Sequence, residues 1–355
     1  MISEIKVLLG FIGLGIEQSP SIEALGELAS CDTIFYESFT SPIVNPKVRE
    51  ELENRLGKEK ILVVSREIVE DGSKILESAK IGKVALVCSG DPMVATTHQD
   101  LRTRAMREGI DTRIIHGSSV VSTAPGELGL HAYNLGRMVT MTREPMQYTS
   151  YFTIFRNLLL GLHSLILLEW DEKTNFFLEP ATAVDALFSA ENDQKLEVVS
   201  EKTLLLIASR LGSKNPKLSV TSFGSIREVN LGAPPHVMVI PGTLHFSERE
   251  ALAAIARVEN PESFADNAAR IHRLSHRMVT KYAEKTLSAL RRAKFAAATC
   301  SGKKFESVFE NVECYTRDAQ RFLNEGRDEL AVLSIGYAEG LLDSLRFSSQ
   351  LEFEW

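Results

Sequence analysis

The sequence predicts an α/β protein with two lobes in series, followed by a helical bundle. Short apolar runs alternate with helical patterns over the first 120 residues, and the alternation restarts with a different rhythm near residue 137. Beyond Pro261 the chain has no further proline and few strand-forming residues. A chain of 355 residues is too long for one compact core. We expect an N-terminal α/β lobe over residues 1–122, a second α/β lobe over 123–260 and a helical domain over 261–355.

The first lobe is expected to contain a mostly parallel sheet. Its strand candidates are apolar runs bounded by Gly, Ser or Asp, at residues 7–12, 33–36, 61–64, 84–88 and 113–116. The first, third and fourth runs are almost continuously apolar, which is typical of strands covered on both faces. Helical patterns at residues 21–29, 67–79 and 97–108 separate the runs. Strands and helices that alternate at this spacing form βαβ units.

The second lobe is expected to contain a mixed sheet. Strand candidates lie at residues 138–142, 164–170, 203–208, 219–222 and 236–241. Helical patterns lie at residues 149–161, 180–190 and 247–258. Residues 203–241 contain no convincing helix, so part of the sheet should be antiparallel. Two α/β lobes in series place a cleft between them, where small ligands tend to bind.

The segment beyond residue 261 is expected to form an antiparallel bundle of about three helices, because its apolar residues recur at helical spacing. Residues 270–304 carry ten Lys or Arg side chains against one acid, whereas residues 305–355 carry four against eleven. Two halves that face and partly neutralise each other explain this pattern. A basic face for RNA or the ribosome over residues 270–304 is the alternative. His272 and His276 have metal-ligand spacing but lack a third ligand, so no metal site is expected.

The composition excludes several classes of protein. A chain with 44% hydrophobic and 25% charged residues is not wholly disordered. The longest apolar runs are shorter than a membrane span, and no export signal precedes the first strand, so we expect a cytoplasmic protein without membrane contact. Four widely spaced cysteines fit reduced thiols. The net charge of −7 makes the chain as a whole a poor nucleic-acid binder.

Two glycines after the first predicted strand mark a place where a ligand could approach the backbone. Gly13 and Gly15 stand at the carboxyl end of this strand. A dinucleotide fingerprint would need a third glycine where the chain has Gln18. Glu37, at the end of the second strand, stands where a ribose-binding acid would lie. A strand-to-helix turn, capped by a nearby serine, explains the same residues almost as well.

Two further segments follow strands and open helices. Residues 88–98 supply the Asp91 carboxylate and two threonine hydroxyls, although a turn capped by Asp or Thr is an equal alternative. Residues 116–122 place amide N–H groups at a helix start, which would suit a carboxylate or a ribose oxygen. His236 enters a strand directly after two prolines and is held rigidly. A single histidine is nevertheless more often structural than catalytic.

The order of these motifs resembles the archaeal diphthine synthase family, from about Val7 to Val258. The segments that carry the resemblance are residues 11–15, 90–98, 115–119, 161–163, 232–236 and 240–246. Residues 90–98, Gly-Asp-Pro-Met-Val-Ala-Thr-Thr-His, are specific to this family within the tetrapyrrole-methylase-like class. The resemblance implies two α/β lobes of the tetrapyrrole methylase type, with the cofactor cleft between them. Residues 315–345 look like a small archaeal helical domain family of unknown function.

The resemblance also implies a methyltransferase that uses S-adenosylmethionine. The residues that would contact this cofactor are Ile16, Asp91, Val94, Ser119, Val120, Leu168, Ala208 and His236. The family's reaction is the successive N-methylation of a 3-amino-3-carboxypropyl histidine on translation elongation factor 2, in diphthamide biosynthesis. It gives a trimethylammonium product. Elongation factor 2 is therefore the implied partner, and a homodimer is the implied assembly.

No catalytic triad is expected, since methyl transfer from a sulfonium mainly requires placement of a neutral amine. We regard His98 and His236 as candidates for proton handling, as a hypothesis. Three alternatives remain: a nicotinamide-dependent oxidoreductase, a corrin or porphyrin methylase of the same fold, and an adaptor whose helical tail binds RNA or the ribosome. We expect cofactor binding to survive deletion of residues 262–355.

Overall fold

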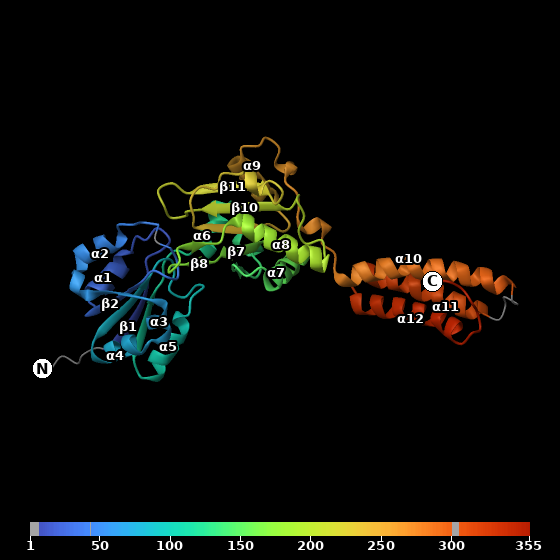
Figure 1. The fold of residues 1–355 in the computed structure, drawn as a ribbon, viewed down its shortest axis with the longest axis horizontal. Coiled ribbons are helices and arrows are strands. Elements are labelled where there is room, and N and C mark those ends of the chain that lie inside the picture. Colours follow the sequence, from blue (N-terminus) through green and yellow to red (C-terminus); the bar gives the residue numbers. More distant parts are fainter. Residues whose placement is uncertain (1–6, 43, 300–304) are drawn as a thin grey trace. The chain divides into compact units, whose positions relative to one another are not determined.

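The computed structural model describes residues 7–42, 44–299 and 305–355. It divides into two compact units, Met1–Ile271 and His272–Trp355, which Figure 1 traces in sequence order. The first unit contains both α/β lobes, and helices are the regular elements of the described part of the second unit.

The first lobe is built on a parallel sheet of five strands in the order β3-β2-β4-β1-β5, as the alternating pattern predicts. The strands are β1 (Leu8–Gly13), β2 (Thr33–Glu37), β3 (Ile61–Val64), β4 (Lys83–Cys88) and β5 (Asp111–Ile115). β1 lies between β4 and β5, and Gly13 is in register with Cys88. The carboxyl ends of these three strands therefore meet at one edge of the sheet.

Helices cover both faces of this sheet. They are α1 (Ile22–Ala29), α2 (Val48–Leu56), α3 (Arg66–Asp71), α4 (Ser73–Ile81) and α5 (His98–Arg107). Phe11 packs in the core on one face and its neighbour Ile12 in the core on the other, which explains the continuous apolar run of β1. The single helix predicted over residues 67–79 is two helices, because Gly72 adopts a left-handed conformation with φ of 70° between them.

The second lobe is built on a mixed sheet in the order β11-β10-β12-β7-β6. Its elements are α6 (Val120–Glu127), β6 (Val139–Met141), α7 (Tyr148–Leu159), β7 (Ser164–Leu168), β8 (Trp170–Asp171), β9 (Phe176–Phe177), α8 (Pro180–Gln194), β10 (Leu204–Ser209), β11 (Lys217–Ser222), β12 (His236–Ile240) and α9 (Phe246–Ala256). β10 pairs antiparallel with β11 and β12, and β12 with β7, which confirms the predicted antiparallel part. The strand predicted over residues 164–170 instead ends at Leu168, and a short β8–β9 hairpin follows it.

Short 3₁₀ helices complete the first unit, at η1 (Lys58–Lys60), η2 (Ala132–Asn134), η3 (Ile226–Glu228), η4 (Pro261–Ser263) and η5 (Ala268–Arg270). The last two lie in residues 261–271, which the sequence pattern assigns to the helical domain. The Asn267 side chain accepts a hydrogen bond from the Leu204 amide (2.9 Å) and donates to the carbonyls of Leu204 (3.0 Å) and Pro241 (2.9 Å). Ile271 packs in the core of the second lobe. Residues 261–271 therefore belong to the first unit.

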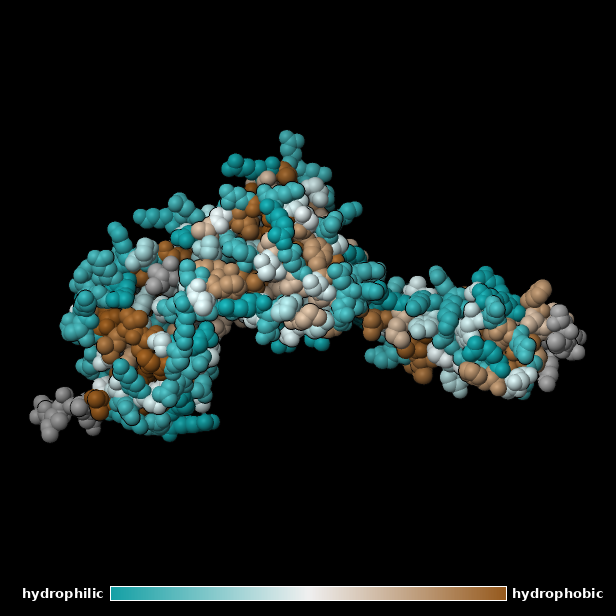
Figure 2. Space-filling model, in the orientation of Figure 1, coloured by the Kyte–Doolittle hydropathy of each residue, from teal (hydrophilic) through white to brown (hydrophobic). Residues whose placement is uncertain are grey.

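The second unit is a bundle of three helices, α10 (Leu274–Thr299), α11 (Glu306–Asn324) and α12 (Asp328–Phe347). Its own apolar core includes Val312 and Leu342. Figure 2 shows hydrophilic side chains interspersed with apolar patches on its visible face. No helix in the described part of the chain is long and apolar enough to span a membrane.

Ion pairs join the basic and acidic halves of the helical unit. Their nitrogen–oxygen distances are 3.0 Å for Arg273–Asp328, 3.8 Å for Lys285–Glu339 and 2.5 Å for Lys294–Glu313. These pairs confirm that the polarised charge is partly neutralised within the bundle. Each pair is partly exposed and contributes little stability by itself. Lys303 and Lys304 lie outside the described residues.

Candidate active site

Close backbone contacts bring together the loops that follow β1, β4 and β5. The Gly15 amide donates to the Gly90 carbonyl (3.1 Å), and the Gly90 amide donates back to Gly15 (2.9 Å). A Cβ atom on Gly13 would overlap the Gly90 carbonyl oxygen and would lie 2.8 Å from the Gly117 nitrogen. Only glycine fits at position 13, because the backbones of three loops meet there. The predicted ligand-facing glycines thus form the junction that places these loops.

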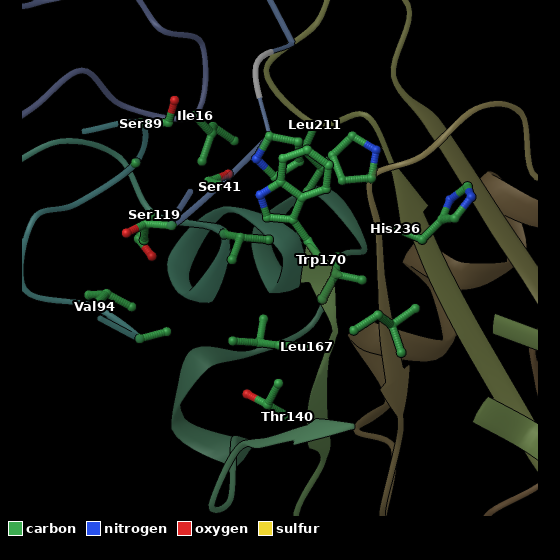
Figure 3. Close-up of a pocket in the computed structure, with 18 of the residues that line it drawn as sticks. Ile16, Ser41, Ser89, Val94, Ser119, Thr140, Leu167, Trp170, Leu211 and His236 are labelled. Carbon is green, nitrogen blue, oxygen red and sulfur yellow. The ribbon is translucent and has the colours of Figure 1, made fainter. Parts of the chain in front are cut away.

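A cavity of about 320 Å³ lies beside this junction, between the two lobes of the first unit. Its lining includes every residue that the resemblance assigns to the cofactor: Ile16, Asp91, Val94, Ser119, Val120, Leu168, Ala208 and His236. In Figure 3, Trp170 lies between Ser119 and His236 in projection. The fold therefore gathers all eight predicted contact residues at one place, although they are spread from position 16 to position 236.

The first lobe contributes polar groups to this cavity. Ser119 is the N-cap of α6, and its hydroxyl accepts a hydrogen bond from the Val121 amide (3.3 Å). Asp91 is 8% exposed; its carboxylate accepts from the Met93 amide (2.8 Å) and contacts His116 Nδ1 (2.7 Å). Asp91 is thus part of a turn, and the side chain of the α5 N-cap residue, Thr97, makes no capping bond within residues 44–299. The loop is shaped by the Asp91 turn and not by a helix cap.

The second lobe contributes apolar residues and one buried histidine. Leu168 and Ala208 line the cavity at the ends of β7 and β10. His236 begins β12, and its Nδ1 forms a 2.8 Å hydrogen bond with Ser209 Oγ. Burial lowers the pKa of His236 to about 4, because the charged imidazolium loses its hydration. The ring is therefore uncharged near neutral pH.

The β8–β9 hairpin supplies an aromatic wall that the sequence pattern does not predict. Trp170 and Phe177 both line the cavity and stack with their ring centroids 4.7 Å apart. The buried indole Nε1 of Trp170 has no hydrogen-bond partner among the described residues. Arg143 lies over the Phe176 ring, 4.1 Å from its centroid, and anchors the hairpin from the other side. The one available signal was the rarity of tryptophan, of which the chain has two.

Two predicted residues lie behind the cavity and not in its lining. His98 and Glu37 are both fully buried, and neither lines the cavity. One Glu37 oxygen accepts hydrogen bonds from the amides of Phe39 and Thr40, each 2.9 Å long. Glu37 therefore shapes a loop of the protein, and the structure does not place it where a ribose-binding acid would be needed.

The fold and the cavity define a class of enzyme. Residues 9–225 match the family model for Tetrapyrrole (Corrin/Porphyrin) Methylases. This match spans the sheet of the first lobe and most of the second lobe. The chain is therefore a methyltransferase with the tetrapyrrole methylase fold, and the nicotinamide-dependent alternative is excluded.

Within this class the chain belongs to the diphthine synthase family. It is 35% identical over 254 residues to the diphthine synthase of Methanothermobacter thermautotrophicus, covering 70% of this chain and 96% of that protein. It is 35% identical over 272 residues to the diphthine synthase of Methanosarcina mazei, covering 73% and 99%. A crystal structure of diphthine synthase superposes with a TM-score of 0.62 and 30% identity, covering 71% and 96%. These matches confirm the family resemblance and the assignment to diphthamide biosynthesis.

A separate family matches the helical unit. Residues 280–351 match a protein family of unknown function, DUF357. The matched residues lie within α10, α11, α12 and the segment that follows. The diphthine synthase relatives cover only about 70% of this chain, so the helical unit is an addition to the enzyme that they share.

Proposed function

We propose that this chain transfers methyl groups from S-adenosylmethionine to the amino group of a 3-amino-3-carboxypropyl histidine on translation elongation factor 2, in the cytoplasm. One observation carries the proposal: a single cavity at the carboxyl ends of β1, β4 and β5 gathers all eight residues assigned to the cofactor. Ligands of open α/β sheets characteristically bind at this edge.

The lining is chemically suited to S-adenosylmethionine. Among the described residues, a Cβ atom on Gly90 would have no neighbour closer than Ser118 O at 4.0 Å, so its backbone is open for the close approach of a ligand. Ile16 and Ala208 offer apolar contact to an adenosine, while Ser119 and the α6 amides offer polar contact at a helix start. The indole N–H of Trp170, which has no partner in the described part of the chain, offers one further donor.

The proposed chemistry requires placement and water exclusion from this chain. S-adenosylmethionine supplies a methyl group already activated by its sulfonium. The two lobes would hold the acceptor amine and the cofactor in one cavity, which would replace a bimolecular encounter by a positioned one. Leu168, Ala208 and Trp170 make part of the wall apolar, and a less hydrated site favours the neutral, reactive form of the amine. The uncharged His236 ring adds no positive charge to the lining of a cavity that would hold a cationic cofactor.

We propose further that the protein is a homodimer, as the family resemblance implies. Sedimentation of the full chain at several concentrations tests this assembly. A single monomeric species at all concentrations would contradict it.

Mass spectrometry of the substrate tests the proposed function. The full chain is incubated with S-adenosylmethionine and elongation factor 2 that carries the aminocarboxypropyl histidine, and the modified peptide is weighed. We expect added methyl groups on this peptide. Elongation factor 2 with an unmodified histidine is the control and should gain none. No added methyl on the modified factor would overturn the proposal.

A further inference from the structure

Glu37 and His98 form a buried pair in which each side chain has one unpaired atom. Both side chains have no solvent exposure, and Glu37 Oε1 lies 3.9 Å from His98 Nε2. Neither atom has a hydrogen-bond partner among the described residues. A buried polar atom without a partner costs free energy, so two such atoms facing each other require an explanation.

The contacts of the other two atoms show where a proton must lie. His98 Nδ1 lies 3.0 Å from the Pro92 carbonyl oxygen, which can only accept, so Nδ1 carries a hydrogen. In a neutral ring Nε2 is then a lone-pair acceptor. Glu37 Oε2 already accepts from the amides of Phe39 and Thr40. One proton between Oε1 and Nε2 is therefore the arrangement that prevents two acceptors from facing each other.

Burial favours a pair without net charge. It raises the pKa of Glu37 to about 7 and lowers the pKa of His98, because each charged form loses its hydration. The protonated carboxyl can then donate to the neutral ring. The 3.9 Å separation is longer than a direct hydrogen bond, so the carboxyl must turn slightly toward the ring to make it.

Two neighbouring titratable groups, Tyr36 and Cys88, keep their uncharged form near neutral pH. Burial raises the pKa of Tyr36 to about 12 and raises the pKa of Cys88 further above its ordinary value. Glu172, in the β8–β9 turn, repels the Glu37 charge from the other lobe. Asp91, in the loop after β4, forms a second carboxylate–histidine pair with His116, 2.7 Å apart. Because His116 contacts a carboxylate of the cavity lining, a test of the Glu37–His98 pair needs a His116 variant as a control.

The pair joins two loops that form one wall of the cavity. Glu37 holds the amides of Phe39 and Thr40, and both residues line the cavity. His98 holds the Pro92 carbonyl, within the loop from which Asp91 and Val94 line the same cavity. The separation between these loops is thus bridged through the two buried side chains.

We propose that Glu37 and His98 are positioning residues that share one proton and so hold the loop of residues 38–42 against the loop of residues 91–97 in the ligand-binding form. The inference rests on the proposed function in one respect, that S-adenosylmethionine binds in this cavity. Loss of the shared proton leaves a buried carboxylate facing a lone pair. The loops then separate to hydrate the carboxylate, and the ligand loses part of its wall.

Calorimetric binding of S-adenosylhomocysteine to the full chain between pH 6 and pH 8.5 tests the pair. We expect the affinity of the wild-type protein to fall roughly tenfold over this range, because the shared proton is lost. Glu37→Gln should bind with an affinity that changes less than about twofold, since its amide donates to Nε2 permanently while its oxygen still accepts from the two amides. His98→Asn should bind weakly throughout, because it keeps a donor to Pro92 but leaves Glu37 unpaired.

Two variants serve as matched controls. Glu248→Gln makes the same substitution in another buried Glu–His pair, where Glu248 lies 3.1 Å from His163 outside the cavity. It should leave the pH dependence of binding unchanged. His116→Gln removes the other histidine that contacts a cavity carboxylate. The proposal would be overturned if the affinity still depended on pH in Glu37→Gln but no longer did so in His116→Gln. A wild-type affinity that is constant with pH would overturn it as well.

Hydrogen exchange without ligand separates this proposal from the proposed function. We expect the amides of residues 38–42 to exchange faster, relative to the rest of the chain, at pH 8.5 than at pH 6 in the wild type, after correction for intrinsic rates. In Glu37→Gln, the corrected exchange rates of these amides should be the same at pH 6 and at pH 8.5. If the wild-type protein bound no ligand but showed this exchange pattern, the proposed cofactor site would be contradicted and the Glu37–His98 pair would not. If the pH dependence of amide exchange were the same in the wild type and in Glu37→Gln, the proposed proton sharing would be contradicted.

Discussion

Gly15 and Gly90 pair across two loops of the first lobe as an isolated antiparallel bridge, although the strands that precede them run parallel. Each residue donates its amide to the carbonyl of the other. The bridge satisfies backbone groups that would otherwise lie unpaired at the end of the sheet, and it fixes one side of the cavity. The glycine junction is therefore a determinant of the site's shape.

A methyl group at the junction should damage both fold and binding. In Gly13→Ala the new Cβ would overlap the Gly90 carbonyl, so the backbone must move. We expect a loss of about 2 kcal/mol in the free energy of unfolding and a loss of S-adenosylhomocysteine binding. Gly26→Ala, in α1 with no atom within 4 Å of its new Cβ, is the control and should stabilise the protein by up to about 1 kcal/mol. Urea unfolding and calorimetry compare the two. Unchanged binding in Gly13→Ala would contradict the role of the junction.

Two serine caps separate stability from ligand binding. Ser119 caps α6 beside the cavity, and Ser21 caps α1 away from it through a 3.1 Å bond to the Ala24 amide. Each Ser→Ala substitution should lower the free energy of unfolding by about 1 kcal/mol. Only Ser119→Ala should also weaken binding of S-adenosylmethionine, because only that hydroxyl lines the cavity. Equal affinities in the two variants would exclude Ser119 from the ligand contacts.

The buried carboxyl of Glu37 should make stability depend on pH. Its pKa is about 7 in the folded chain against 4.5 in the unfolded chain, so the folded state retains a proton that the unfolded state releases. Stability from this group is fully present below pH 4.5 and is lost as the pH rises through 7. Glu37→Gln should therefore gain stability relative to wild type between pH 5 and pH 8, by at most about 3 kcal/mol. Urea unfolding at pH 5 and at pH 8 measures the difference in stability between Glu37→Gln and the wild type. A difference that is the same at both pH values would refute the raised pKa of Glu37.

Tryptophan fluorescence should report occupation of the cavity. The chain has two tryptophans, Trp170 in the cavity wall and Trp355 in the helical unit. In Trp355→Phe, S-adenosylhomocysteine should change the emission of Trp170, because the ligand replaces water beside the indole. Trp170→Phe retains only Trp355 and should show no change. A change of emission in Trp170→Phe would mean that the ligand binds near Trp355 or that its binding affects the helical unit.

The position at which the tail is removed should decide whether the enzyme remains stable. A chain ending at Ile271 keeps the three Asn267 hydrogen bonds and the buried Ile271 side chain. We expect it to melt at a temperature close to that of the methylase part in the full chain and to retain cofactor binding. A chain ending at Pro261 should lose about 3 kcal/mol or more, through unpaired groups on β10 and a gap in the core. Thermal melts of both truncations test this, and equal melting temperatures would contradict it.

Much of the fold was predictable because it depends on local patterns. The apolar runs of β1 and β4 indicated covered parallel strands, and Gly13 and Asp91 stood at strand ends where a parallel sheet places its ligands. Ile16, Ser119 and His236 came from the family resemblance, and the structure places all three in the cavity lining. The polar helix α2 was missed because only Val48 and Leu52 are buried in it.

The sequence by itself determined the order of elements, the two α/β lobes, the helical addition and the loops that carry the site. It could not determine which side chains those loops bury. Glu37 and His98 carry polar groups that would suit a ligand, but contacts between distant segments enclose them behind the cavity wall. The same holds for Trp170, whose hairpin is recognisable only once β7 ends at Leu168. Periodicity and turn residues act between neighbours in the chain, whereas burial and proton sharing depend on groups that only the tertiary structure brings together.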